Sequence, residues 1–282
     1  MPVINVILIA LTSLFLSPAD ALAHLPLDGT DQQRLANGLG SVALFVFWLG
    51  FTIGARRTRP ALHRWLIFQG ATLIAIFTVF GPLDMLAETS TAAHMTQHML
   101  MMVVIAPLWV LAQPLPQWAA VAGYPGIRLW TPVLRIGRYP VLAAALHAAV
   151  IWFWHAPRLY VLALENPWWH VLEHACFLLT ASVFWWSVLR STPRSAPRAL
   201  LALLFTLMHT GLLGALLTFA NAPLYGAERS LQSQQLAGLI MWVLGGLPYI
   251  AAASWCGHRW FRQLLRRSMG AASRNSRVFE GE

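Results

Sequence analysis

Five histidines recur at matching positions near the ends of three apolar segments. His94 and His98 open one segment, His155 closes the next, and His170 and His174 open a third. Neutral imidazole is a ligand for copper, zinc and iron, including haem iron. An imidazole buried in a bilayer is costly unless it finds a partner. The pattern predicts one metal or haem site formed by all five histidines, with hydrogen bonding between helices as the structural alternative.

The spacing within each pair supports this prediction. Histidines four residues apart lie on the same face of a helix, so His94 with His98 and His170 with His174 each present two rings in one direction. Four methionines share the segment of the first pair: Met95, Met99, Met101 and Met102. A thioether favours Cu(I), but methionine more often fills gaps in a protein core.

The third segment also contains a peptidase-like pattern. His170, Glu173 and His174 read as HxxEH, in which two histidines bind zinc and the glutamate activates water. The sequence offers no clear third ligand set and no substrate groove, so we expect a protein that is not an enzyme. Glu173 could instead orient a ligating histidine. Two deeper residues, His147 and His209, could form a second site, a step on a transfer path, or structural contacts.

The composition indicates a polytopic membrane protein. Hydrophobic residues make up 58% of the chain and charged residues 10%. The net charge of +9 comes from arginines clustered between apolar runs, which is a pattern of membrane topology and not of nucleic-acid binding. The two cysteines, Cys176 and Cys256, are far apart and form no CxxC motif.

The apolar runs predict an all-α, polytopic membrane helix bundle with seven transmembrane helices. A span needs about 20 apolar residues. The runs cover 38–55, 62–83, 92–113, 139–160, 167–190, 197–222 and 231–257. Residues 114–138 contain four prolines and are expected to form a long loop on the membrane face, with Trp118 and Trp130 as interfacial anchors.

The two ends of the chain lie outside this bundle. Residues 1–23 end in Ala21-Leu22-Ala23 and are predicted to be a cleaved signal peptide, with an extra N-terminal helix as the alternative. The transmembrane domain then covers 24–260, and 261–282 form a basic cytoplasmic tail. Arginine-rich connections alternate with arginine-poor ones along the seven runs. The positive-inside rule therefore predicts an outward N-terminus, a cytoplasmic C-terminus and an outer position for the five histidines.

Several motifs occur in the order found in one known family. They are HMTQHML at 94–100 with Ala106-Pro107, WFWHAP at 152–157, HVLEH at 170–174, LGALLTF at 213–219, and QQLAGLIMW at 234–242. Together they cover about 90 to 255, and the chain resembles the CtaG family of cytochrome c oxidase assembly factors. One position departs from the family pattern, because Ser233 precedes the two glutamines where aspartate is usual.

The resemblance implies an integral protein of the cell inner membrane that aids an active terminal oxidase through its copper centres. The expected partners are cytochrome c oxidase subunits and membrane lipid, with no nucleic acid. We expect copper as the bound metal, and haem as its alternative. Three other functions remain open at this point: a haem-binding membrane cytochrome, a copper transporter and a membrane metallopeptidase.

Overall fold

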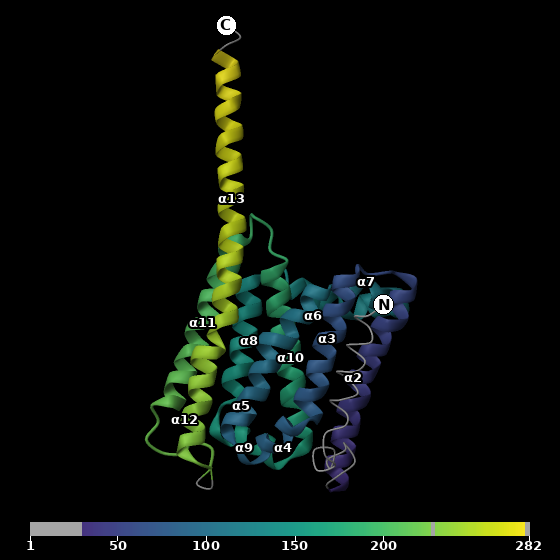
Figure 1. Ribbon diagram of the computed structural model, residues 1–282, viewed down its shortest axis with the longest axis vertical. Coiled ribbons are helices and arrows are strands. Elements are labelled where there is room, and N and C mark those ends of the chain that lie inside the picture. The colour runs from purple at the N-terminus through teal and green to yellow at the C-terminus, as the bar shows by residue number, and fades with distance from the viewer. Residues whose placement is uncertain (1–29, 227–228, 280–282) are drawn as a thin grey trace, which may run out of the picture.

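The protein is a bundle of upright helices (Figure 1). The computed structural model describes residues 30–226 and 229–279. No strand occurs among these residues, which confirms the predicted all-α membrane bundle. The predicted signal peptide, 1–23, lies outside the described residues. The helices are α2 (Asp31–Arg57), α3 (Leu62–Phe80), α4 (Pro82–Thr89), α5 (Thr91–Met99), η2 (Leu100–Ile105), α6 (Ala106–Ala112), α7 (Leu115–Ile136), α8 (Pro140–Trp154), α9 (Pro157–Glu165), α10 (Pro167–Leu189), α11 (Ala196–Thr218), α12 (Leu231–Leu239), η3 (Ile240–Leu244) and α13 (Gly246–Phe279).

Six helical spans in the described part of the chain are long and apolar enough to cross a membrane. The predicted span at 139–160 is shorter than expected, because α8 ends at Trp154 and α9 begins at Pro157. The residue before a proline favours an extended backbone, and Ala156 adopts φ −63° and ψ 130°. Counted together with Trp130–Ile136, to which it is bent by 105°, α8 gives up to seven spans.

The predicted loop at 114–138 is wrong in its structure. These residues form α7, whose backbone is interrupted only at Gly123, with φ 63° and ψ −163°. Pro125 lies two residues after this kink and Pro132 lies within the helix that follows, so the prolines do not abolish the helix. Trp118 donates a hydrogen bond to the Phe47 carbonyl at 3.1 Å, and so fixes α7 against α2, while Trp130 is exposed.

The central span runs through α5, η2 and α6. Of its apolar window 67% is buried, compared with 11% for α2 at the edge of the bundle. The π-helical segment η2 precedes Pro107, and η3 likewise precedes Pro248. A helical proline has no N–H, and its ring crowds the carbonyl four residues earlier, so a wider turn relieves the conflict. Both spans thereby stay continuous.

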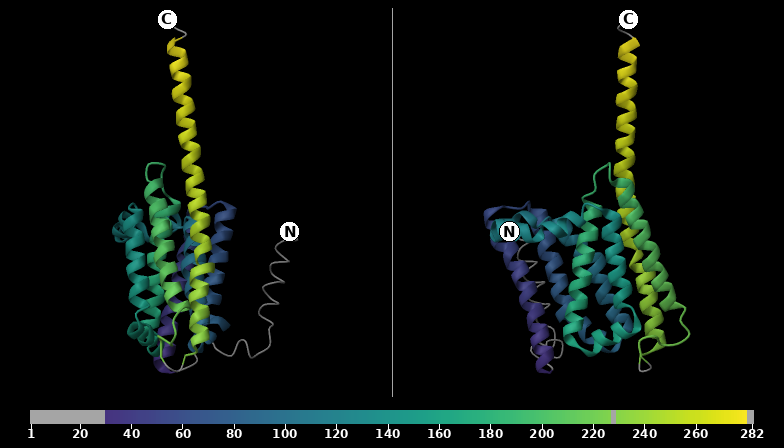
Figure 2. Two further views of the ribbon diagram at one scale, coloured as in Figure 1. Left: turned by 90° about the vertical axis from the view of Figure 1, so that its left-hand side faces the viewer. Right: turned by 180° about the vertical axis from the view of Figure 1, so that it is seen from behind.

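The two ends of the bundle differ. The short helices α4, α9 and α12 lie at one end with the start of α5, whereas α7 lies at the other end (Figure 1). At that other end α13 continues well beyond the bundle as a single rod (Figure 2). We call these the histidine end and the arginine end, after the residues that distinguish them.

Candidate metal centre

Helix α5 is fixed at the histidine end by two caps. Ser90 accepts a hydrogen bond from the Ala93 N–H at 3.3 Å, and Ser233 of α12 accepts one from the Ala92 N–H at 3.1 Å. These bonds satisfy amide groups that a helix start leaves unpaired. Ser233, the departure from the family motif, therefore holds the helix that carries His94 and His98.

Helix α10 begins with a similar cap. Asn166 accepts hydrogen bonds from the amides of Trp168 and Trp169, and Pro167 occupies the first turn, where it costs no hydrogen bond. His170 and His174 follow on one face of the helix. Helix α10 packs against η2 and α6, which continue α5. This packing turns the second histidine pair toward the first.

The fifth histidine enters from α8. His155 is the C-cap of this helix, and its Nδ1 lies 2.8 Å from the Ile151 carbonyl oxygen. The Tyr225 hydroxyl donates to the His155 carbonyl at 3.3 Å. Because Nδ1 of His155 is paired with the Ile151 carbonyl, Nε2 is the ring nitrogen left for another partner.

The five rings gather in one place. Ring centroids are 4.2 Å apart both for His94 with His98 and for His170 with His174. Across the helices, His94 lies 5.6 Å from His170 and His98 lies 5.4 Å from His174. His155 is 6.4 Å from His98. Four of the rings are buried and His170 is half-buried.

A carboxylate joins the histidines at the centre of this cluster. The Glu173 Oε2 lies 3.9 Å from His94 Nε2 and 3.7 Å from His98 Nε2, and the side chain is fully buried. Two groups have possible ligand atoms within 4.8 Å of one another: His94, His170 and Glu173, and His98, Glu173 and His174. From the sequence, Glu173 is predicted only as a base or as an orienting residue. The HxxEH spacing was the signal that it shares the face of His170 and His174.

The possible ligand atoms of the cluster lack hydrogen-bond partners among the described residues. Both ring nitrogens of His94 and His98, the Nε2 of His155, His170 and His174, and both Glu173 oxygens are buried without a hydrogen bond. Buried polar groups are normally paired, since an unpaired one costs free energy. Nitrogen donors with one carboxylate suit copper or zinc, so the residues fit a metal ion.

Aromatic residues and one arginine cover the cluster at the histidine end. The Tyr160 ring lies 5.2 Å from the His94 ring and stacks on Tyr225 at 3.8 Å. The Arg229 guanidinium donates to the Glu88 carbonyl at 2.6 Å and lies 6.0 Å from the Tyr160 ring. These contacts join α9, α4 and the segment before α12 into one cover.

A polar network that no sequence motif indicates lies next to α5. The Gln97 amide donates to Asp84 Oδ1 at 2.7 Å and to the Thr78 carbonyl at 2.9 Å. Burial raises the pKa of Asp84 to about 6, Glu88 adds to the rise, and the Gln97 hydrogen bond opposes it. Because Gln97 precedes His98, this network ties α3 and α4 to the histidine helix.

Other candidate residues lie apart from the cluster. His147 Nδ1 is 2.9 Å from the Thr180 hydroxyl, which supports a structural role, and His209 packs against Phe205. The methionines lie in hydrophobic clusters, as their packing role predicts: Met95, Met99 and Met102 in one, Met101 in the other. Both cysteines are free thiols.

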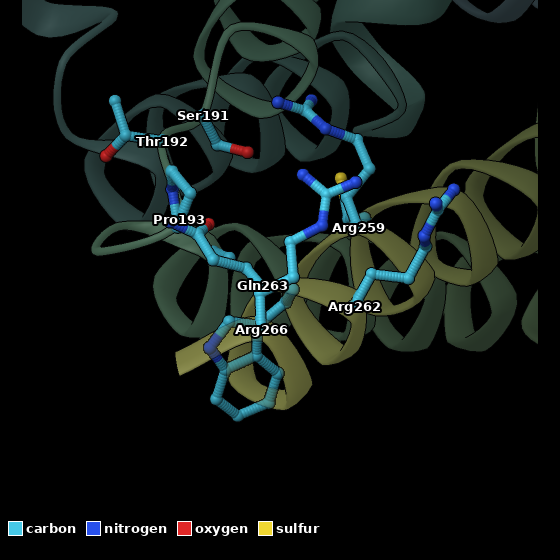
Figure 3. Close-up of a pocket in the computed structure, with 10 residues that line it drawn as sticks. Ser191, Thr192, Pro193, Arg259, Arg262, Gln263 and Arg266 are labelled. Carbon is cyan, nitrogen blue, oxygen red and sulfur yellow. The ribbon is translucent and has the colours of Figure 1, made fainter. Parts of the chain in front are cut away.

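A cavity of about 650 Å³ (Figure 3) lies at the arginine end, opposite the five clustered histidines. Its lining includes Ser191, Cys256, Arg259, Arg262 and Arg266. In Figure 3 the Arg262 head is turned away from the loop that holds Thr192 and Pro193. Several guanidinium groups repel a cation, so this cavity is not the candidate metal centre.

Comparison with known proteins identifies the family. Residues 45–263 match the family model of the cytochrome c oxidase caa3 assembly factor, Caa3_CtaG. The chain belongs to this family. The match covers most of the transmembrane bundle and all five histidines, and it makes the chain a membrane-embedded cytochrome c oxidase assembly factor. No curated protein and no solved structure matches the chain.

Proposed function

We propose that this assembly factor binds copper in its histidine cluster and supports metallation of cytochrome c oxidase. The observation that supports the proposal is the convergence of five imidazoles and one carboxylate, each with at least one buried ligand atom that has no hydrogen-bond partner among the described residues. The imidazoles would supply neutral nitrogen ligands. Glu173 would supply negative charge to balance the cation. Copper would be the cargo that is delivered to the oxidase, and the protein would hold it and shield it from the bilayer.

Burial of Glu173 argues against peptide hydrolysis. A catalytic base must reach a water molecule and a substrate carbonyl. The Glu173 side chain is fully buried and faces His94 and His98. A peptide could approach it only after the surrounding helices moved. The arrangement therefore suits holding a metal better than catalysis, and we assign the protein a non-enzymatic role.

The packing around the rings favours a bare ion over haem. Phe177 lies 4.7 Å from the His98 ring and 6.1 Å from the His155 ring, while Tyr160 lies against His94. A macrocycle bound to any of these imidazoles would need a flat slot beside it, where aromatic side chains already pack. An ion needs only small shifts of the existing rings.

The proposed orientation places this site where an oxidase could receive copper. The connections at the arginine end carry the arginine clusters of the sequence, and the positive-inside rule puts that end in the cytoplasm. In the cell inner membrane, the histidine cluster would then face the periplasm. The oxidase subunits that acquire copper would meet the protein on that side.

A substitution in the cluster tests the role in metallation. His98→Ala should lower oxidase activity in the membrane while the variant remains present at a similar level, because it removes a central imidazole but no apolar segment. Loss of a residue that only supports a metal ligand lowers metal affinity by about 10–100-fold. His98 is a proposed ligand itself, so metal affinity should fall by more than about tenfold. Added copper should partly restore activity by mass action.

His209→Ala is the matched control. His209 is also a buried transmembrane histidine without a hydrogen-bond partner in the described chain, but it lies outside the cluster. Oxidase activity should stay near wild type in this variant. Normal oxidase activity in His98→Ala, with the variant present in the membrane, would overturn the proposal. A Soret absorption band in the purified protein would show bound haem, and haem would then replace copper as the proposed ligand.

A further inference from the structure

The four paired histidines form a ladder with two rungs. One rung joins His94 to His170, and the other joins His98 to His174, with ring centroids 5.6 Å and 5.4 Å apart. Both helices use the same four-residue spacing, which advances about 6 Å along a helix axis. The two rungs therefore lie one turn apart, and each takes one imidazole from α5 and one from α10.

Glu173 connects the two rungs. Its Oε2 is nearly equidistant from His94 and His98, at 3.9 Å and 3.7 Å from their Nε2 atoms. The same carboxylate belongs to both three-residue groups whose ligand atoms lie within 4.8 Å of one another. A carboxylate has two oxygens with about four lone-pair sites, and neither Glu173 oxygen has a hydrogen-bond partner among the described residues. It can therefore serve one ion with each oxygen.

The number of donors exceeds what one ion can use. Five imidazoles and a carboxylate offer six ligand groups, whereas copper and zinc sites built from protein side chains commonly use three or four. The compact ligand groups divide along the rungs, and neither of them spans both. Ions in two-metal sites lie about 3.5–4 Å apart, a separation that one bridging carboxylate can span.

We propose that the cluster binds two transition-metal cations bridged by Glu173. One ion would bind His94 and His170, and the other His98 and His174. This inference rests on the proposed function and adds the number of metal ions that each chain binds. It assigns Glu173 as the shared ligand rather than as an orienting residue.

The two positions differ in their surroundings. His155 has a ring contact with the His98 rung, with centroids 6.4 Å apart, and after a small shift it would add a third imidazole there and bring the protein ligands to four. The His94 rung has three donors, and its His170 is half-buried. Four ligands close a tetrahedral site, and three leave a position open for exchange. The ion on the His94 rung is therefore the exchangeable one, and the ion on the His98 rung is held more firmly.

Metal stoichiometry tests this inference. The full-length protein is purified in detergent, loaded with excess Cu(I) under reducing conditions and freed of unbound metal, and copper per chain is measured by mass spectrometry. We expect two copper ions per wild-type chain and two in His209→Ala. The double variants His94→Ala/His170→Ala and His98→Ala/His174→Ala should each retain one. Glu173→Gln, which keeps shape but removes charge and the bridge, should retain at most one.

A second readout follows the bridge itself. After loading with Cu(II), two bridged ions should couple magnetically and give a weakened electron paramagnetic resonance signal per copper. Each double variant should restore the full signal of an isolated ion. Helical circular dichroism and elution volume are measured for every variant, so that a misfolded chain is not counted as a loss of metal.

The outcomes separate this inference from the proposed function. One copper per wild-type chain, lost entirely in both double variants, would overturn the two-ion centre and leave the metallation role standing. No bound copper in the folded wild-type chain would overturn both. Two coppers without magnetic coupling, unchanged in Glu173→Gln, would refute the bridge.

Discussion

Glu173 differs from its neighbours because it is the one group in the cluster whose side chain can become negatively charged. A cation bound there would exchange hydration for imidazole nitrogens and an anionic oxygen in a medium of low dielectric constant. Without a cation, an ionised carboxylate at this depth would face the full cost of desolvation. A single residue thus makes the site selective for a positive occupant.

Asp84 provides a prediction about pH. Its pKa is raised by burial from 3.8 to about 6, so the folded protein keeps this proton where the unfolded chain has lost it. The folded state binds more protons between pH 3.8 and about 6, and stability should fall as pH rises through that window. Asp84→Asn should flatten this fall. Thermal unfolding of both proteins in detergent across the window measures the difference.

The difference between the two proteins is the useful quantity, because other buried groups add their own pH dependence. Asparagine keeps an oxygen that can accept the Gln97 hydrogen bond, which is 2.7 Å long in the wild type. If both unfolding curves shift with pH by the same amount, the carboxyl group of Asp84 does not ionise on unfolding in the way proposed.

At the scale of the elements, α11 and α12 are held together through glycine. A Cβ at Gly238 would lie 2.5 Å from the Gly214 carbonyl oxygen, and one at Gly214 would lie 2.8 Å from the Gly238 oxygen. Small residues let membrane helices approach backbone to backbone. This contact positions α12, whose Ser233 caps the histidine helix α5.

Gly238→Ala should therefore destabilise the protein by about 1–3 kcal/mol, the usual cost of overpacking, because the added methyl group meets backbone that cannot easily move. The matched control is Gly70→Ala in α3, where a Cβ would meet nothing within 4 Å. That change should be neutral or stabilising by about 0.5–1 kcal/mol, since alanine is the better helix former. Thermal unfolding in detergent compares them. Equal stabilities for the two variants would contradict the close contact.

At the scale of the whole molecule, the two ends differ in the side chains that they carry. The histidine end carries the candidate centre and its cover of Tyr160, Tyr225 and Arg229. The arginine end carries a cavity lined by guanidinium groups and the projecting part of α13. Such a separation suits a protein whose metal chemistry belongs to one side of the membrane.

The orientation can be tested with reporter fusions. Fusions after Arg59, Arg135 and Arg194 should report the cytoplasm, because arginine-rich connections stay on that side. Fusions after Glu88, Glu165 and Glu228 should report the exterior. Arg135 and Glu165 flank α8 in the chain, so this pair of fusions also tests whether the 15-residue helix crosses the membrane. The reverse pattern would place the histidine end in the cytoplasm and rule out metallation from outside.

The sequence by itself determined most of the membrane-spanning helices and the faces of the histidine pairs. Both depend on short-range rules: about 20 apolar residues make a span, and residues four apart share a helix face. The bounds of α10 at Pro167 and Leu189 differ from the predicted 167–190 by one residue. The family motifs are also short stretches of consecutive residues, so they can be recognised without the tertiary structure.

Only the tertiary structure decided how the faces meet. Whether α5, α8 and α10 are neighbours, and how each is rotated, depends on contacts between distant residues such as Ser233 with Ala92. The placement of Glu173 between His94 and His98 follows from that rotation, and no local pattern fixes it. The helical form of α7 was missed for the same reason, because its packing against α2 outweighs the helix-breaking tendency of its prolines.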